Sequence, residues 1–241
     1  MEQENYKVRA EELRKQIEYH SNRYYNMDDP EITDYEYDMM MKELKKIEKD
    51  HPEFVTPNSP TQHVGGSAKR EAGVLVRHRV PMLSLQDVFS KEEVQEFVES
   101  MQETLVDPVF VVEYKIDGLS MALRYENGLL TTAITRGDGI IQGEDVTVNA
   151  KVIKDVKNKL KEPIEYLEVR GEVYMTNEAF DKVNEIQELN NKKTFANPRN
   201  CAAGTLRQLD SRITKQRNLS MFIFNIQDIR GKEITSHSQG Y

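Results

Sequence analysis

The sequence has one cysteine, Cys201, among its 241 residues. A single cysteine excludes an internal disulfide bond and a cysteine-rich zinc site within the chain. No apolar run approaches the roughly 20 residues of a membrane span, and the first residues have neither the basic nor the apolar region of a signal peptide. Internal repeats and low-complexity tracts are also missing. These absences predict a protein of a reducing, cytoplasmic compartment that does not cross a membrane.

The balance of charge is acidic, with a formal net charge of −8 at pH 7. This charge argues against a protein whose whole surface binds nucleic acid. The balance is reversed over residues 192–217, where Asp210 is the one acid among the bases Lys192, Lys193, Arg199, Arg207, Arg212, Lys215 and Arg217. That segment could contact phosphates, and a solvated basic face is an equally good interpretation.

The composition, 38% hydrophobic and 31% charged, is that of a soluble chain that can bury a core. Its length suits one full domain with a smaller one beside it. A connector rich in proline and glycine at residues 54–70 marks the boundary. We therefore predict a first domain at residues 1–66 and a second at 67–241.

Two helices are predicted in the first domain. The first, at about residues 5–25, has apolar residues at helical spacing. The second begins with a capping box, formed by Thr33 and by Glu36 three places on, and it ends before Pro52. Near the turn between them the sequence gathers aromatic and acidic side chains, namely Tyr24, Tyr25, Asp34, Tyr37 and Asp38. Aromatic faces beside carboxylates suit a planar, positively charged ring, although tyrosines in a helix stripe more commonly belong to a core.

Residues 109–118 carry the most informative pattern. The apolar run at 109–112 predicts a buried strand, and the alternation that follows puts Glu113, Lys115 and Asp117 on one face. Ionisable groups on an apolar strand cost free energy unless they are paired or used in chemistry. Two interpretations are open: a surface lysine between carboxylates, or a lysine nucleophile at the floor of a nucleotide pocket.

A hairpin is predicted directly after this stretch, because Asn127-Gly128 is the strongest short signal for a two-residue turn. Counting outward from that turn puts Arg136 opposite Leu119, and therefore close to Lys115. The other predicted elements are helices that begin after Ser90, at about Asn177 and at Asn197-Pro198, and strands at 167–174 and 219–226.

A lysine amine attacks only when it is neutral. Lowering its pKa from about 10.4 to near 7 requires about 4.6 kcal/mol of differential stabilisation, at roughly 1.36 kcal/mol per unit. A neighbouring cation favours that change, whereas Glu113 and Asp117 oppose it. We therefore assign the two carboxylates to holding hydroxyls, an exocyclic amine or a hydrated magnesium ion. Arg136, together with a bound metal ion, is the better candidate for lowering the pKa of Lys115 and neutralising a phosphate.

Several motifs carry a family resemblance. Lys115-Ile116-Asp117-Gly118 resembles the first motif of the covalent nucleotidyltransferases, the superfamily of DNA ligases, RNA ligases and capping enzymes. A longer set, spread over nearly the whole chain, resembles NAD-dependent DNA ligases: Tyr24, Asp34-Tyr35-Glu36-Tyr37-Asp38, Ser84-Leu85, Arg136-Gly137-Asp138-Gly139, Val169-Arg170-Gly171-Glu172 and Phe195-Ala196-Asn197-Pro198-Arg199-Asn200.

The resemblance implies a fold and a reaction. The fold is of the α+β class, with a small helical domain followed by a mixed or antiparallel-sheet, ATP-grasp-like nucleotidyltransferase domain that is incomplete at its C-terminal end. In the reaction, Lys115 attacks the adenylyl phosphorus of NAD, releases nicotinamide mononucleotide and becomes lysyl-AMP. The AMP passes to the 5′-phosphate at a nick in double-stranded DNA, and the 3′-hydroxyl then displaces it. Magnesium is implied as an assistant to attack and departure, and the protein is expected to be a monomer.

The resemblance also implies roles for individual residues. Lys115 is the nucleophile. The nicotinamide half of NAD is expected to be bound by residues of the helical domain, namely Tyr24, Tyr25, Asp34, Tyr35, Glu36, Tyr37 and Asp38. The adenosine half of NAD is expected to be bound by Ser84, Leu85, Glu113, Asp117, Arg136 and Glu172. Arg199 and Arg207 are expected to meet DNA or its 5′-phosphate.

Three departures from the family pattern matter. Tyr25 stands where many members have histidine, and the loop at 139–143 is one residue longer than usual. The later lysine-bearing motifs, the OB-fold, the four-cysteine zinc module, the helix-hairpin-helix region and the BRCT domain are absent. We therefore expect a fragment or a natural truncation that binds NAD but ligates poorly, with zinc confined to the absent part.

Two other functions remain open at this stage. An ATP- or GTP-using nucleotidyltransferase shares the lysine motif, but it is not expected to need a helical hairpin with Asp34 and Tyr37. A catalytically deficient module that binds NAD or another protein fits the missing motifs. The intact Lys115, Asp117 and Glu172 argue against that module.

Overall fold

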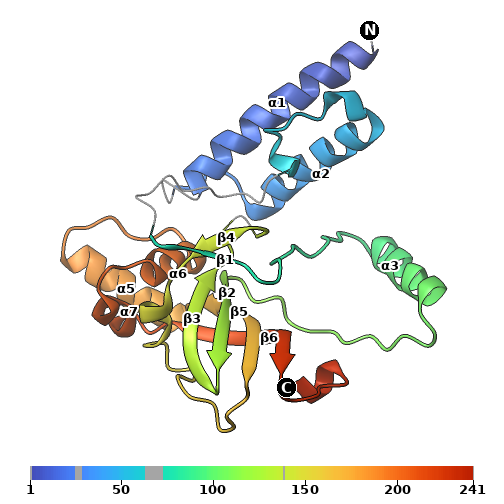
Figure 1. Ribbon diagram of the computed structural model, residues 1–241. Coiled ribbons are helices and arrows are strands. Elements are labelled where there is room, and N and C mark those ends of the chain that lie inside the picture. Colours follow the sequence, from blue (N-terminus) through green and yellow to red (C-terminus); the bar gives the residue numbers. More distant parts are fainter. Residues whose placement is uncertain (1, 25–28, 63–72, 138, 241) are drawn as a thin grey trace.

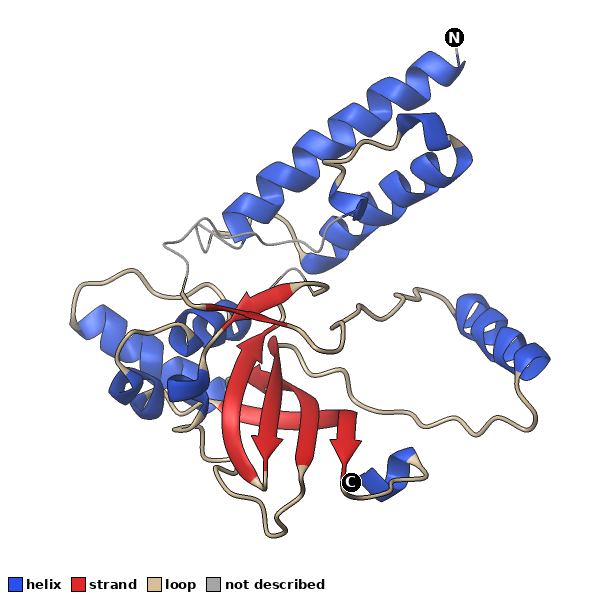
Figure 2. Ribbon diagram, viewed as in Figure 1, coloured by secondary structure: helices blue, strands red, loops and turns tan. Residues whose placement is uncertain are grey.

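The computed structural model describes residues 2–24, 29–62, 73–137 and 139–240. A helical hairpin at the N-terminus adjoins a larger part built on antiparallel sheets (Figures 1 and 2). The predicted α+β class is confirmed. The predicted boundary between residues 66 and 67 lies outside the described residues.

The hairpin consists of α1 (Glu2–Asn22) and α2 (Asp34–Asp50). The two helices pack through a small core made of Ala10, Leu13, Ile17, Leu44 and Ile47. The predicted capping box is confirmed, because Glu36 N donates to Thr33 Oγ1 and Thr33 N donates to Glu36 Oε2 at 2.8 Å. Both helices predicted for the first domain are thus present. No described helix is long and apolar enough to cross a membrane.

Two short turns, η2 (Pro52–Phe54) and η3 (Pro60–Gln62), follow α2. They are held to the hairpin by Glu48, which is 5% exposed. Arg14 Nη2 donates to Glu48 Oε1 at 3.0 Å, and Ser59 Oγ donates to the same oxygen at 2.6 Å. This buried carboxylate therefore stabilises the end of the helical part.

The main sheet has the strand order β3-β2-β5-β6, with every neighbouring pair antiparallel. Its strands are β2 (Leu119–Glu126), β3 (Leu129–Thr135), β5 (Tyr166–Tyr174) and β6 (Ser220–Arg230). A second, two-stranded sheet pairs β1 (Leu75–Arg77) with β4 (Gln142–Glu144). The strands predicted at 167–174 and 219–226 are confirmed within one residue at their starts, and the last one runs further than predicted.

The turn at Asn127-Gly128 is confirmed, but the predicted register is wrong by one residue. A bulge between Arg124 and Tyr125 shifts the pairing of β2 with β3. Arg136 therefore lies opposite Ser120, to whose carbonyl its backbone N–H donates at 3.1 Å. A bulge adds an unpaired residue that no simple count along two strands can anticipate.

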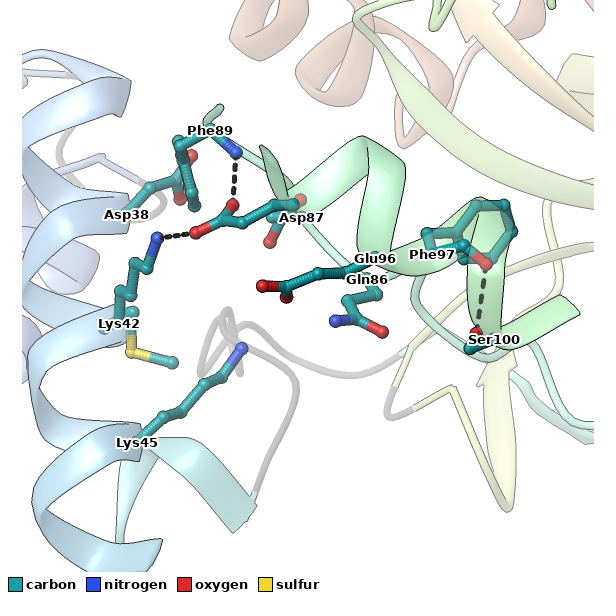
Figure 3. A pocket seen from close by; sticks show the side chains of 11 residues that line it. Asp38, Lys42, Lys45, Gln86, Asp87, Phe89, Glu96, Phe97 and Ser100 are labelled. Carbon is teal, nitrogen blue, oxygen red and sulfur yellow. Dashed lines mark hydrogen bonds and ion pairs between the residues drawn. The ribbon is translucent and has the colours of Figure 1, made fainter. Parts of the chain in front are cut away.

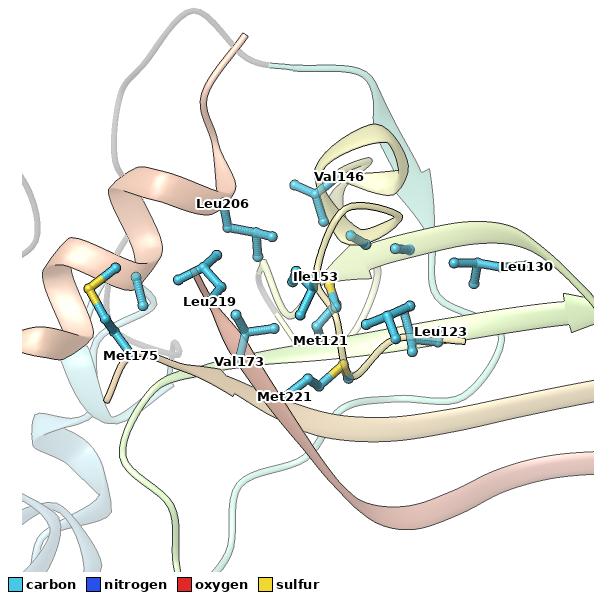
Figure 4. Packing of buried hydrophobic residues seen from close by; sticks show 14 of the residues in the cluster. Met121, Leu123, Leu130, Val146, Ile153, Val173, Met175, Leu206, Leu219 and Met221 are labelled. Atoms are coloured by element: carbon cyan, nitrogen blue, oxygen red, sulfur yellow. The ribbon is translucent and has the colours of Figure 1, made fainter. Parts of the chain in front are cut away.

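Helices cover one face of the main sheet. They are α4 (Thr147–Ala150), α5 (Asn177–Leu189), α6 (Pro198–Leu206) and α7 (Ser211–Gln216). Figure 4 shows side chains of β2, β5 and the start of β6 meeting Leu206 of α6 in the core. The helix predicted to start at Asn177 is confirmed, and so is the cap of α6, where Asn200 N donates to Asn197 Oδ1 at 2.8 Å.

The buried strand predicted at residues 109–118 is not formed. Residues 108–117 are neither helix nor strand, and Val109, Val112 and Tyr114 are 91%, 97% and 92% exposed. Figure 1 shows this stretch and the preceding helix α3 (Lys91–Thr104) standing away from the sheets. A strand needs the backbone of a neighbour to pair with, and no described strand pairs with this stretch. The apolar run therefore has the residue types of a strand, but no neighbouring strand in the described residues pairs with it.

The apolar side chains of α3 are also uncovered. Ser90 caps the helix as predicted, since Glu93 N donates to Ser90 Oγ at 3.1 Å. No residue of α3 is buried, however, and Val94 and Phe97 are 47% and 48% exposed. An apolar contact on this side joins Phe97 to Phe110, with ring centroids 6.3 Å apart.

This difference between expectation and structure can be measured. Because Val112 is 97% exposed, we expect Val112→Ser to change the free energy of unfolding by less than about 0.5 kcal/mol. Leu123 is 1% exposed, and Leu123→Ala is expected to cost about 2–5 kcal/mol. Urea unfolding of the two variants checks both values. A loss in Val112→Ser as large as that in Leu123→Ala would mean that residues 109–112 are buried after all.

Candidate nucleotide-binding and lysine-transfer site

Lys115 lies on the irregular stretch just before β2, and its side chain is exposed. Its charge acts on two carboxylates from separate parts of the fold, Glu172 on β5 and Asp38 on α2. Burial raises the pKa of both carboxyls, and the Lys115 ammonium opposes that rise in each case. The Lys115 charge therefore acts on one carboxylate of the helical hairpin and one of the main sheet, although the strand predicted to carry the lysine is absent.

The residues after Lys115 are held firmly. A Cβ on Gly118 would lie 2.1 Å from the carbonyl oxygen of Val173, so the position requires glycine where the chain crosses the end of β5. Arg199 Nε donates to the carbonyl of Gly118 at 3.1 Å and lies 3.8 Å from Asp117 Oδ1. The Lys-Ile-Asp-Gly motif is thus anchored at its C-terminal end.

The alternation predicted that Glu113, Lys115 and Asp117 share one face of a strand. This prediction is wrong. Glu113 Oε1 lies 3.1 Å from Nε2 of His237, near the C-terminus, while Asp117 faces Arg199. The reason is the same lack of a neighbouring strand, since only pairing would hold the chain in the pleated form that aligns alternate side chains.

Glu172 is a carboxylate of this region whose pKa is raised. Burial raises its pKa, and a hydrogen bond from Ser120 Oγ to Glu172 Oε2 at 2.7 Å works in the opposite direction. Arg199, Lys115 and Arg170 also act to lower the pKa. Buried acids among several cations are typical of functional sites.

The raised pKa of Glu172 predicts a pH dependence of stability. Because the folded pKa lies above the unfolded one, this group contributes stability that is complete below the unfolded pKa and is lost as the pH rises through the folded pKa. We expect Glu172→Gln to gain stability relative to the parent as the pH is raised from about 4 to about 7. Urea midpoints at the two pH values measure this. An equal difference at both, or a gain at the lower pH only, would contradict it.

Arg136 forms a compact cluster with the segment before α3. Its Nε donates to the carbonyl of Met82 at 3.1 Å, and its Nη2 donates to Ser84 Oγ at 2.5 Å. Arg170 Nη1 donates to the neighbouring carbonyl of Leu83 at 3.0 Å. Burial lowers the pKa of Arg170, and the Arg136 charge lowers it further. Since the Glu172 charge also acts on Arg170, the cluster adjoins this partly buried carboxylate.

Sequence reasoning missed two residues of this site. Ser120 supports Glu172, and His78 Nε2 lies 2.8 Å from the carbonyl oxygen of Arg136. Ser120 pairs with Glu172 across β2 and β5, a neighbour relation that no local pattern reveals. The one available signal for Ser120 was a hydroxyl within an otherwise apolar start of a strand.

The residues of the hairpin that were predicted to bind NAD lie in different environments. Glu36 caps α2, Tyr37 packs against the hairpin core, and Tyr35 is 62% exposed with its ring against Phe89. Asp34 begins α2 and acts electrostatically on Tyr24 and Asp38. Tyr25 lies outside the described residues. The predicted site residue Leu85 is 76% exposed on the other side of the site.

A cavity of about 460 Å³ separates α2 from α3 and the segment before it (Figure 3). Asp38 is the predicted site residue that lines it, together with cations of α2 and acids of the opposite wall. Lys42 Nζ contacts Glu93 Oε1 at 2.5 Å and lies 4.8 Å from the centre of the Phe89 ring. This cavity of mixed charge therefore borders the hairpin side of the site, and Lys115 is not among its lining residues.

The two arginines predicted to meet DNA are paired within the chain. Arg207 Nε lies 2.7 Å from Glu144 Oε2, and Arg199 contacts Gly118, Asp117 and Tyr24. No group of three or more histidine, cysteine, aspartate or glutamate side chains within the described ranges could hold a metal ion. A divalent ion here would need ligands from a bound nucleotide, which is the usual arrangement for magnesium beside phosphates.

Comparisons with known proteins cover the chain in two parts. Residues 3–65 match the family model of the DNA ligase-like, N-terminal NAD+-binding domain, and residues 73–241 match that of the NAD-dependent DNA ligase adenylation domain. Among curated proteins, the DNA ligase of Clostridium kluyveri is 56% identical over 97% of this chain and 35% of its own length. Those of Acetivibrio thermocellus and Carboxydothermus hydrogenoformans are 51% and 48% identical over 95% and 97% of the chain. The chain spans about a third of the length of these relatives.

Proposed function

The chain belongs to the NAD-dependent DNA ligase family, and on this premise we propose that its Lys115 accepts AMP from NAD. The neutral amine attacks the adenylyl phosphorus and loses one proton to solvent, a phosphoramidate N–P bond forms, and the phosphoanhydride bond breaks to release nicotinamide mononucleotide. The observation that supports this role best is the position of Lys115 in the fields of both Glu172 and Asp38. A group that joins the two halves of a dinucleotide site must lie where the hairpin and the sheet meet.

The remaining roles follow the same division. We propose that residues 1–66 bind the nicotinamide half, chiefly through Tyr24, Asp34, Tyr37 and Asp38. Residues 67–241 bind the adenosine half through Ser84, Leu85, Glu113, Asp117, Arg136 and Glu172. The Arg136 cluster supports this assignment because it offers a cation fixed by two hydrogen bonds beside a partly buried acid. Such a fixed charge costs little reorganisation when a phosphate binds.

The partner of the loaded lysine is proposed to be a nick in double-stranded DNA, approached through Arg199 and Arg207. Magnesium, bound with the nucleotide phosphates, would supply Lewis-acid stabilisation of the charge on phosphorus. We place the protein in the cytoplasm as a monomer. Because α3 and residues 109–114 leave apolar side chains uncovered, we propose that this chain alone transfers AMP slowly and seals nicks poorly.

Intact-mass measurement tests the proposal. After hours with NAD and magnesium, we expect a minor species heavier by one adenylate, absent from Lys115→Arg and absent when ATP replaces NAD. An adduct formed from ATP but not from NAD would show an ATP-using nucleotidyltransferase instead.

The exposure of the Lys115 segment favours a second candidate, a module that binds NAD without transfer. Saturable NAD binding with no adduct after prolonged incubation would identify it. Lys115→Arg should then bind NAD as the parent does, because the lysine would have no chemical task.

A further inference from the structure

A second cavity, of about 380 Å³, lies along α5 and the C-terminal end of α7. Its volume is within the range of sites that bind small molecules. In Figure 1 the two helices lie at one side of the main sheet, and α3, which borders the first cavity, lies at the other. Within the described ranges, no residue predicted for the NAD or DNA site lines this second cavity. It is therefore separate from the site around Lys115.

The floor of the second cavity is apolar. Ala179 and Val183 of α5 line it, and they are 7% and 5% exposed. Ile213 of α7 also lines it and is partly buried. An apolar group that covers these side chains is removed from water, and this transfer favours binding. The floor therefore suits the apolar part of a ligand.

The charged residues that line the same cavity are mostly cations. Lys182, Lys192 and Arg217 stand against one acid, Glu178, among its described lining residues. In the described part of the chain none of the three cations forms an ion pair, whereas Arg212 of α7 pairs with an aspartate at 2.8 Å. The cavity is thus a local excess of positive charge on a chain whose formal net charge is −8. A ligand complementary to it carries negative charge.

Arg217 is held in place without being neutralised. Its Nη1 donates to Thr205 Oγ1 at 3.0 Å, and its guanidinium carbon lies 5.3 Å from the centre of the Phe195 ring. Thr205 is fully buried, so the guanidinium is anchored to the interior of the domain. Neither contact brings a negative charge, and the hydrogen bond to Thr205 does not use the edge formed by Nε and Nη2. A carboxylate or a phosphate matches such an edge with two parallel hydrogen bonds.

We propose that the second cavity binds a small organic anion, in which a carboxylate or phosphate group is attached to a compact apolar body. The acid group pairs with Arg217 and the two lysines, and the apolar body covers Val183 and Ile213. A phosphate of the DNA backbone has no apolar group for this floor, so it matches only the charged half of the cavity. The site goes beyond the proposed function, because none of its residues takes part in adenylate transfer.

Titration of the full 241-residue chain with phenyl phosphate and with benzoate tests the proposal, with amide chemical shifts as the readout. We expect saturable shifts at residues 176–190 and 213–218 for at least one of the two probes, and the tighter probe identifies the acid group. Inorganic phosphate and acetate lack the apolar body, and benzyl alcohol lacks the charge. Each of these three should bind about tenfold more weakly or less than that.

Three variants and a control make the result specific to the cavity. Arg217→Gln removes the fork and should weaken the tighter probe about tenfold or more, and Arg217→Lys should fall between it and the parent. Lys182→Gln changes an exposed side chain of α5 and should weaken the probe about two- to fivefold without affecting the fold. Lys215→Gln is the matched control, because it removes one charge from the last turn of α7 but does not line the cavity. Its affinity should stay within about twofold of the parent's.

Four results overturn the proposal. The first is the lack of a saturable shift with either probe at concentrations up to about 10 mM. The second is binding of inorganic phosphate as tight as that of phenyl phosphate, which identifies a simple electrostatic contact. The third is a set of shifts centred on residues 113–118, which places the probe in the Lys115 site. The fourth is parental affinity in both Arg217→Gln and Lys182→Gln.

Discussion

Arg124→Met is expected to lower the free energy of unfolding by about 3–5 kcal/mol, because it leaves a buried carboxylate without its counter-charge. Arg124 and Glu168 are 6% and 1% exposed and face each other across β2 and β5. Arg124 Nε donates to Glu168 Oε2 at 2.7 Å, and Tyr166 Oη donates to the same oxygen at 2.6 Å. Arg124 Nη2 also donates to the carbonyl of Arg77 on β1 at 3.0 Å, so the pair ties the two sheets together.

Two comparisons separate this effect from a general sensitivity to loss of arginine. Arg212 forms an ion pair with Asp210 at 2.8 Å, but its side chain is 86% exposed, so Arg212→Met should cost less than about 1 kcal/mol. The double variant Arg124→Met with Glu168→Leu should recover part of the loss, because no unpaired charge stays buried. Chemical unfolding of the three proteins measures this. A cost for Arg124→Met as small as that for Arg212→Met would contradict the buried pair.

Arg136→Ala is expected to slow adenylation of Lys115 by about 10²–10³-fold, the usual effect of removing one fixed donor that stabilises charge in a transition state. The guanidinium is held by Met82 and Ser84 at 3.1 and 2.5 Å. A charge fixed in advance can neutralise the adenylyl phosphate without rearrangement. Single-turnover formation of the adduct, followed by intact mass, gives the rate.

The matched variants for Arg136 test position and charge separately. Arg136→Lys keeps the charge but loses the fork, so it should fall between the parent and Arg136→Ala. Arg212→Ala removes an exposed arginine on α7 and should leave the rate unchanged. Unfolding curves exclude loss of structure as the cause. An adduct that forms at the parental rate in Arg136→Ala would end the proposed role of this arginine.

Local patterns predicted most of the elements around the site. The capping box at Thr33 and Glu36, the turn at Asn127-Gly128 and the cap at Asn197 are confirmed because each depends on residues within three places of one another. The bulge at Arg124 and Tyr125 was not predictable, since it depends on how β2 fits both β3 and β5. Short-range chemistry therefore defined where elements begin, and pairing between strands decided their register.

The same distinction applies to the site. The motifs at Lys115, Arg136 and Glu172 stand out in the sequence. In the fold, Arg136 pairs with Ser120, whose hydroxyl donates to Glu172, and the Lys115 charge acts on Glu172. Ser120 was missed because its partnership with Glu172 arises from the β2–β5 pairing. The strand at 109–118 was predicted wrongly because apolar, β-branched residues favour a strand only where a neighbouring backbone can pair with it. A sequence pattern contains the first condition and not the second.

The most direct measurement locates the adenylate on the chain. The protein is incubated with magnesium and with NAD labelled in its adenylyl phosphate, digested, and mapped by mass spectrometry. The account predicts label on Lys115 alone, with no label retained by Lys115→Arg. Label on any other residue, or a chain that remains unlabelled while nicotinamide mononucleotide is released, would contradict it.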